Sequence, residues 1–400
     1  MRQTPYYVFD TDEFAKRAAM IRAALDCKGG RRIPLCFSIK ANPFLLHRLP
    51  EGLDHVEVCS PGELEICIAL GVKPESIIYS GVMKEKCDIE RAVSYGAGIL
   101  TCESIRHATL ISEVMLECMP EGAHEAEFAE MKAQVILRLT SGNQFGMSLD
   151  DIEYIISHPD EFKGIAVMGI HYYSGTQKSL RKINKDLEKI KSALTGLKEK
   201  YGFEPQLVEY GPGLCVEYFE DDWQEKEKQS LDEAAEVLRE FAVEYPLGIE
   251  MGRFLAASCG KYYTQVKDLK STGDANYAIL DGGIHHLNYF GQRMAMQVPP
   301  ISIYRAAGVE LTQLPDIDYT LCGSLCTVAD VLVREVKLKK LELGDVLEFG
   351  HCGAYSVTEA PVLFLSRQLP AIYAYSKEYG YECLREHIPA AEINLAGKKL

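Results

Sequence analysis

The stretch RIPLCFSIKANP, residues 32–43, joins a strand-like pattern to a charged side chain. Apolar residues alternate up to Ile39, Lys40 follows at once, and Asn42 and Pro43 end the strand. Taken alone, Lys40 is an ordinary surface lysine at a junction between strand and loop. The rest of the chain changes this interpretation, because apolar strand-like stretches recur up to about residue 255.

Eight such stretches alternate with helix-like segments. They are RIPLCFSI, HVEVCS, SIIYSG, AGILTC, AQVILRL, GIAVMGIHYY, PQLVEYG and PLGIEMG. The clearest helix pattern spans residues 179–201, where apolar residues at intervals of three or four form one stripe and Gly202 ends the helix. Eight strands alternating with helices predict a (β/α)8 TIM-like barrel over residues 25–255. A doubly wound open sheet is the alternative.

The pattern changes after residue 255. Short strand-like stretches then follow one another without long helices, which predicts a C-terminal antiparallel β-domain of residues 256–400 joined by residues 1–24. Two polar stretches, 117–128 and 218–230, are interpreted as surface insertions.

Composition limits the partners. The 400 residues include 58 acidic and 43 basic side chains, and the net charge of −15 argues against nucleic acid or an anionic membrane as the main partner. The N-terminus carries no secretory signal, and no apolar run could span a bilayer. The 13 cysteines lack framework spacing, which indicates reduced thiols and a cytoplasmic location. Cys322, Cys326, His351 and Cys352 do not have a standard zinc-ligand spacing, so we expect no metal site.

The ends of the predicted barrel strands collect the unusual side chains. In such barrels the C-terminal strand ends carry the chemistry, and Lys40, residues 171–177, residues 211–213 and residues 250–253 all follow strands. The glycine turn after residue 209 exposes backbone N–H groups that suit a phosphate, although most such turns are only turns. Glu250 and Arg253 form an ordinary surface salt bridge if they are considered alone.

In this order the segments resemble the fold-III pyridoxal phosphate (PLP) decarboxylases, the family of the diaminopimelate, ornithine and arginine decarboxylases, whose barrel is like that of alanine racemase. The matching segments are SIKANP, CSPGELEICIALGV, IHYYSGTQ, EYGPGLCVEY, EMGRFLAASCG, GSLCTVADVL and GDVLEFGHCGAY. They extend over nearly the whole chain. Each is a weak signal alone, but seven in order are specific.

The resemblance implies catalytic roles for three residues. Lys40 would form the Schiff base with the cofactor, Glu250 would stabilise the pyridinium that serves as electron sink, and Cys326 would protonate the substrate carbanion. It also implies a homodimer with shared active sites, in which Cys326 reaches the partner subunit's site. The cofactor-binding residues implied by the match are Lys40, Tyr173, Thr176, Gly211, Gly213, Glu250, Gly252, Arg253 and Tyr355.

The chain departs from well-known family members where the substrate is recognised. Thr327 replaces the glutamate or aspartate that reads the distal amine of a diamino acid, and Tyr173 replaces the histidine that stacks on the cofactor. Thr327 and Asp330 are therefore the candidate substrate residues, although Asp330 is more in keeping with ordering its loop.

The sequence thus predicts PLP-dependent decarboxylation of an amino acid or a derivative of one. The combination of HYYSGTQ, DGGIHH and FLSRQLP resembles the branch that acts on glutamyl groups tethered to an acyl carrier protein. Three alternatives remain open at this point: a decarboxylase of diaminopimelate or another diamino acid, an amino-acid racemase, and a non-catalytic PLP-binding protein. Glu250 weighs against the racemase, which has arginine at that position.

Overall fold

A computed structural model describes residues 2–26, 30–118, 131–305 and 310–397. They form two compact units, each described by itself below. The barrel unit contains residues 17–215 and 226–254, and the β unit contains residues up to 16, 216–225 and those from 255 onward.

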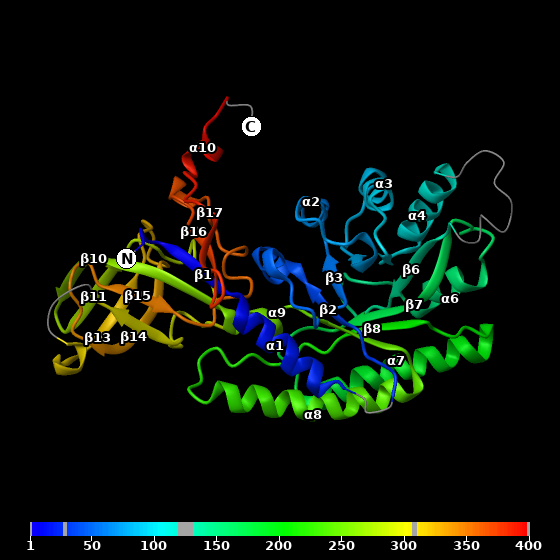
Figure 1. Ribbon diagram of the computed structural model, residues 1–400, viewed down its shortest axis with the longest axis horizontal. Coiled ribbons are helices and arrows are strands. Elements are labelled where there is room, and N and C mark those ends of the chain that lie inside the picture. Colours follow the sequence, from blue (N-terminus) through cyan, green and yellow to red (C-terminus); the bar gives the residue numbers. More distant parts are fainter. Residues whose placement is uncertain (1, 27–29, 119–130, 306–309, 398–400) are drawn as a thin grey trace. The chain divides into compact units, whose positions relative to one another are not determined.

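The barrel unit is a closed barrel of eight parallel strands (Figure 1). Each strand pairs with the next along the chain, and β9 pairs with β2 to close the ring. The prediction of a (β/α)8 barrel is confirmed, and the alternative of an open sheet is wrong. The strands are β2 (Leu35–Ser38), β3 (His55–Val58), β4 (Ile77–Tyr79), β5 (Ile99–Cys102), β6 (Ala133–Arg138), β7 (Ile165–Tyr173), β8 (Leu207–Gly211) and β9 (Leu247–Met251).

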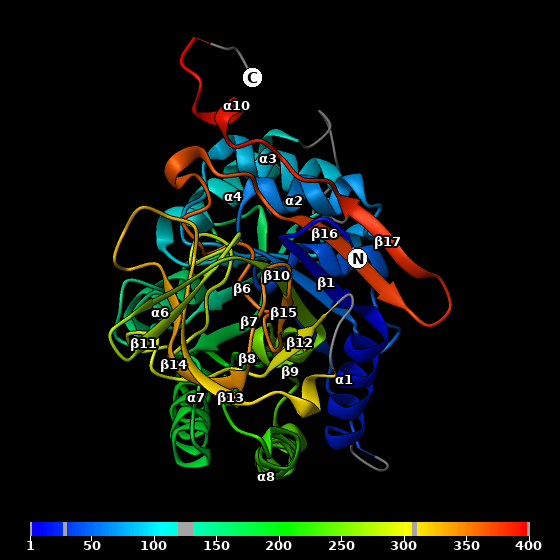
Figure 2. The same ribbon diagram turned by 90° about the vertical axis from the view of Figure 1, so that its left-hand side faces the viewer.

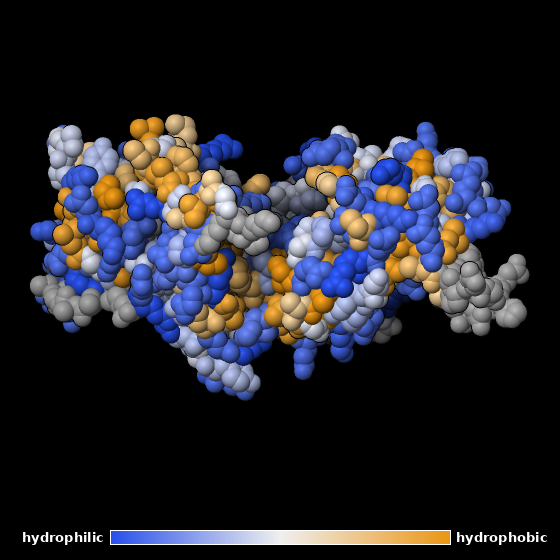
Figure 3. Space-filling view, turned by 90° about the horizontal axis from the view of Figure 1, so that it is seen from above, coloured by the Kyte–Doolittle hydropathy of each residue, from blue (hydrophilic) through white to orange (hydrophobic). Residues whose placement is uncertain are grey.

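Helices cover the outside of the barrel strands, with α2–α4 on one side and α7–α8 on the other (Figures 1 and 2). Their bounds are α1 (Thr11–Ala24), α2 (Pro61–Ala69), α3 (Lys86–Tyr95), α4 (Ile105–Glu117), α6 (Leu149–Ser157), α7 (Leu180–Tyr201), α8 (Trp223–Glu244) and α9 (Arg253–Ala256). The predicted helix 179–201 is confirmed as α7, whose apolar stripe is buried and whose C-cap Gly202 has φ +66°. Over α2–α4, Figure 3 shows a mainly hydrophilic surface with scattered apolar residues, as expected for amphipathic helices.

The β unit carries a nine-stranded mixed sheet. Its bounds are β1 (Tyr6–Asp10), β10 (Gly260–Thr272), β11 (Ala275–Leu280), β12 (Ile301–Tyr304), β13 (Asp316–Cys322), β14 (Val331–Lys339), β15 (Val346–Phe349), β16 (Ala371–Ser376) and β17 (Gly380–Arg385), with helix α10 (Ala391–Asn394) after them. A separate β unit was predicted, but the prediction that it is wholly antiparallel is wrong. The N-terminal strand β1 lies between β10 and β16 and runs parallel to β16, and β11 runs parallel to β13.

The polar stretch 218–230 is not a surface insertion as predicted. It contains the first turns of α8, and its Glu227 is buried in an ion pair with Arg17 of α1, at 2.7 Å. Charged residues on the polar side of a long helix made the stretch look like a loop. The other predicted insertion, 117–128, lies mostly outside the described residues. None of the described helices has the length and apolar character needed to cross a membrane.

Candidate active site

Three glutamates lie within strands of the barrel that are otherwise apolar. Glu57 on β3, Glu209 on β8 and Glu250 on β9 are 2%, 2% and 8% exposed. A buried carboxylate is costly unless a cation or hydrogen-bond donors compensate it. The partners of these three groups therefore define the site.

Lys40 supplies that compensation for two of them. It follows β2 directly, in a short 3-10 turn, Ile39–Ala41. Its Nζ lies 2.7 Å from Oε2 of Glu57 and 3.5 Å from Oε1 of Glu250, and Sγ of Cys59 lies 3.4 Å away. The lysine that opened the sequence analysis is therefore held between two buried carboxylates and is not a plain surface side chain.

Glu250 is held on both of its oxygens. The hydroxyl of Ser38 donates to Oε1, and Nε2 of His171 lies 3.1 Å from Oε2. Burial acts to raise the pKa of Glu250, but the charge of Lys40 and the hydrogen bond with His171 outweigh it and hold this pKa well below its usual range. The carboxylate is ionised and able to hold a positive charge on a ligand.

Glycines at the end of β8 allow neighbouring segments to pack more closely than a side chain would permit. A Cβ at Gly211 would come 2.5 Å from Cδ2 of Tyr173, and a Cβ at Gly213 would come 2.2 Å from the carbonyl oxygen of Gly175. Gly213 also has φ +57°, which glycine adopts without strain. Thr176, Gly211 and Gly213 therefore lie together at the ends of β7 and β8, at positions that the sequence predicts to hold the phosphate.

Lys178 is buried beside Gly211 and Gly213. Its Nζ lies 2.8 Å from Oδ2 of Asp186 and 2.9 Å from the carbonyl oxygen of Gly211. A Cβ at Gly213 would come 2.8 Å from its Cε. The carboxylate of Asp186 compensates the charge of this lysine, and the ion pair holds the loop between β7 and α7 in place.

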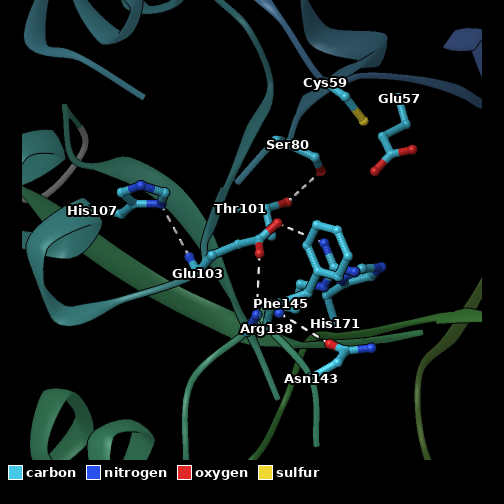
Figure 4. Close-up of polar contacts among 12 residues, drawn as sticks. Glu57, Cys59, Ser80, Thr101, Glu103, His107, Arg138, Asn143, Phe145 and His171 are labelled. Carbon is cyan, nitrogen blue, oxygen red and sulfur yellow. Dashed lines mark hydrogen bonds and ion pairs between the residues drawn. The ribbon is translucent and has the colours of Figure 1, made fainter. Parts of the chain in front are cut away.

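A second buried ion pair orders the loop after β6. Arg138 donates to Oε1 of Glu103 at 2.6 Å, and the backbone N–H of Gly146 donates to Oε2 at 3.1 Å (Figure 4). The Phe145 ring lies over the Arg138 guanidinium, with 4.9 Å between Cζ and the ring centroid. The loop 139–148 is thereby held against the end of β6.

Two further predicted site residues of the barrel unit follow β9. Gly252 packs against Ser38 and Ala41, where a Cβ would find neighbours at 3.1–3.3 Å, and Arg253 begins α9 directly after β9. The structure thus brings together Lys40 and Glu250, and Tyr173 with Gly211, as predicted for a barrel mouth.

The remaining predicted residues belong to the β unit. Cys326 and Thr327 are exposed at the tip of a loop, whereas Asp330 is buried. The Asp330 carboxylate accepts hydrogen bonds from the N–H groups of Ile284 and Leu325 at 2.8 and 2.6 Å, so it orders the loop. Tyr355 adopts φ +66°, an uncommon conformation for a residue other than glycine.

Sequence reasoning assigned no role to Glu57, Ser38 or His171, which contact Lys40 or Glu250. A signal for Glu57 was present, because HVEV, LVEY and GIEM each place a glutamate inside an apolar strand. Ser38 and His171 carried no comparable signal, since serine and histidine at strand ends are common. Within the described ranges, no group of three or more histidine, cysteine or acidic side chains could hold a metal ion.

Comparison with known proteins gives a consistent result. Residues 11–257 match the family model "Pyridoxal-dependent decarboxylase, pyridoxal binding domain". The L-glutamyl-(BtrI acyl-carrier protein) decarboxylase of Niallia circulans is 27% identical over 424 residues, covering 98% of this chain and 93% of the relative. The 2-[(L-alanin-3-ylcarbamoyl)methyl]-2-hydroxybutanedioate decarboxylase of Staphylococcus aureus is 29% identical, covering 84% and 86%. The crystal structure of diaminopimelate decarboxylase from M. jannaschii with L-lysine has a TM-score of 0.80 at 23% identity, covering 99% and 92%, and this likeness concerns the fold.

Glu209 leads to a prediction about pH and stability. Neither of its oxygens has a hydrogen bond of ordinary geometry among the described residues, although the weak thiol donor of Cys36 interacts with the carboxyl group. Burial, and then the charges of Glu250 and Glu57, raise its pKa well above the ordinary value of 4.5. The folded protein therefore binds the proton of the Glu209 carboxyl group more tightly than the unfolded chain does. The stabilisation from this proton is fully present below pH about 4.5, and it is lost as the pH rises toward the pKa of Glu209 in the folded protein.

The substitution Glu209→Gln replaces the carboxyl group with a neutral amide, so the variant should not show this loss of stability at rising pH. We expect the urea midpoint of the variant, relative to wild type, to increase steadily between about pH 5 and pH 8. Glu199→Gln, on the exposed side of α7, removes one carboxyl group without touching the barrel interior and should show no such trend. Parallel pH profiles for wild type and Glu209→Gln would show that Glu209 is ionised in the folded state.

Proposed function

Because this chain belongs to the pyridoxal-dependent decarboxylases, we propose that it decarboxylates an aminoacyl group whose distal end is an uncharged carbonyl, with a glutamyl group on a carrier protein as the leading candidate. Family membership establishes the cofactor and the class of reaction, and it favours decarboxylation over racemisation and over non-catalytic PLP binding. The residue roles and the substrate given below are the proposal. None of the described cysteines is in a disulfide, and this supports the proposal of a cytoplasmic location.

The residues present fit the cofactor. Lys40 would attach it covalently, Tyr173 would stack on its ring, and Thr176 with Gly211 and Gly213 would hold its phosphate. Gly252, Arg253 and Tyr355 complete the set that the sequence match implies. When bound, pyridoxal phosphate accepts the electron pair that remains on the α-carbon when CO2 departs.

The chain's own side chains would manage charge and protons. Glu250, kept ionised by Lys40 and His171, would hold the proton on the pyridine nitrogen. Glu57, at 2.7 Å from Nζ of Lys40, is placed to hold the lysine proton or to accept it. Cys326 would deliver a proton to the α-carbon.

Thr327 carries the choice of substrate. Its Oγ1 accepts a hydrogen bond from the N–H of Ala329 at 3.3 Å, so its hydroxyl proton can be donated. A donor suits an amide or thioester carbonyl, whereas a distal ammonium needs an anionic acceptor. The Niallia circulans relative supports the same choice, because its name describes a glutamyl group on a carrier protein.

A direct competition between substrates tests the proposed function. CO2 release should be efficient for glutamyl groups on a carrier protein and poor for free lysine, ornithine and diaminopimelate. Thr327→Asp should shift the preference toward the diamino acids, because it restores an acceptor for the ammonium. A wild-type kcat/KM near or above about 10⁴ M⁻¹s⁻¹ for a free diamino acid would support diamino-acid decarboxylation, the second candidate, instead.

The covalent role of Lys40 is open to a sharper test, because the barrel contains other amines that are more deeply buried. Lys84 is only 4% exposed, and burial lowers its pKa to about 8. Borohydride reduction followed by peptide mapping should place the cofactor on Lys40. An adduct on Lys84, or on both, would contradict the assignment.

We propose a homodimer in which Cys326 of one subunit serves the Lys40 site of the other. Its exposure at a loop tip supports this. Lys40→Ala and Cys326→Ala should each be nearly inactive, whereas randomly mixed subunits should recover about a quarter of wild-type activity. Subunit exchange without recovery would assign both residues to one subunit.

A further inference from the structure

The first turns of α7 lie at the same rim of the barrel as Lys40. β7 ends at Tyr173 and α7 begins at Leu180, so the start of this helix follows the C-terminal end of a barrel strand (Figure 1). The end of α7 lies toward the opposite rim. In barrels of this kind the C-terminal rim carries the active site.

Basic side chains at the two ends of α7 differ in their partners. Near the C-terminal end, Lys191, Lys198 and Lys200 form ion pairs with Glu244, Glu204 and Glu153 at 2.6–2.8 Å. At the N-terminal end, the exposed side chains of Arg181, Lys182 and Lys185 have no hydrogen-bond or ion-pair partner in the part of the chain that the structure describes. The unpaired cations thus gather at the active-site rim.

Folding alone does not account for these cations. The N-terminus of a helix carries a positive partial charge, which favours acidic side chains there and disfavours basic ones. The first turn of α7 has no acidic residue. The first acidic residue of the helix, Asp186, is already bound to Lys178.

A pocket of about 350 Å³ opens beside these residues. Lys182, Lys185 and Lys189 line it with the hydroxyls of Ser141 and Thr176, and the carboxylate in the lining, Asp186, is bound to Lys178. Amines and hydroxyls are hydrogen-bond donors, and a phosphodiester offers only acceptors and one negative charge. The pocket therefore has the chemistry of a phosphodiester site. Lys189, which donates to the carbonyl oxygen of Thr140 at 2.8 Å, joins α7 to the loop that carries Ser141.

The charge of the whole chain makes this surface selective. With a net charge of −15, the protein repels acidic partners at long range. Local cations dominate only within a Debye length, about 8–10 Å at physiological salt. An acidic partner is therefore guided to the few places where basic residues are unpaired.

We infer that this pocket and Arg181 bind a carrier protein at the phosphodiester of its phosphopantetheine arm and the acidic surface around it. The inference rests on the proposed carrier-linked substrate. It adds a binding surface whose basic residues on α7 are separate from those assigned to the chemistry, and whose pocket shares Thr176 with the proposed cofactor-phosphate site.

The test compares two charge-reversal variants on one helix. The rim variant carries Arg181→Glu, Lys182→Glu and Lys185→Glu, and the control carries Lys191→Glu, Lys198→Glu and Lys200→Glu. The probes are the phosphopantetheinylated BtrI acyl-carrier protein charged with L-glutamate, and S-glutamyl-pantetheine, which has no phosphate. Binding of the labelled carrier is measured by fluorescence anisotropy and turnover by CO2 release, both with PLP-loaded protein.

The rim variant should raise Kd and KM for the loaded carrier by at least about tenfold, with kcat unchanged within about twofold. Its KM for S-glutamyl-pantetheine should not change, and the control should behave like wild type. Higher salt should weaken carrier binding by wild type and the control more than by the rim variant.

Three results would overturn the proposed binding surface. They are equal effects of the two variants, a fall in kcat alone, and a changed oligomeric state in sedimentation. An unchanged Kd and KM for the carrier in the rim variant would also overturn the proposed binding surface, even if CO2 is released. The proposed function would then stand without this binding surface. Charge-dependent carrier binding without CO2 release from any glutamyl thioester would defeat the proposed function and support the surface.

Discussion

The site depends on keeping a negative charge inside the barrel. Glu250 is almost fully buried, and burial alone would neutralise it. Lys40, His171 and Ser38 instead stabilise its ionised form, and each comes from a different position at the barrel ends. A carboxylate held in this way can stabilise a positive charge on a bound ring in surroundings where water cannot screen the interaction.

Barrel closure makes this arrangement possible. Lys40 follows β2, whereas Glu250 lies on β9, more than two hundred residues later, and the pairing of these two strands completes the ring. In the same register, Ser38 is aligned with Glu57 of β3. The two carboxylates that contact the lysine therefore lie on the strands at either side of it. An open sheet with the same strands would leave β2 and β9 at opposite edges and would separate Lys40 from Glu250.

In the proposed function, substrate choice and partner choice involve different parts of the molecule. The chemistry is attached to strand ends of the barrel, whereas Thr327 lies on a loop of the β unit whose position is fixed by the buried carboxylate of Asp330. The start of α7 adds a third surface, where cations remain unpaired beside a donor-rich pocket.

The sequence by itself determined the architecture and the central residues of the site. Strand and helix periodicity is a local property, so eight barrel strands and the limits of α7 could be read directly, and the ordered motifs identified Lys40, Glu250 and the glycine turn. Local patterns could not show that β1 pairs in parallel with β16, or that residues 218–230 start a helix with a buried glutamate, because both depend on contacts between distant segments. The roles of Glu57, His171 and Lys178 likewise became visible only in the tertiary structure. Whether a charged side chain inside a strand is compensated depends on which partner the closed barrel brings within a few ångströms of it, and one-dimensional spacing does not contain that information.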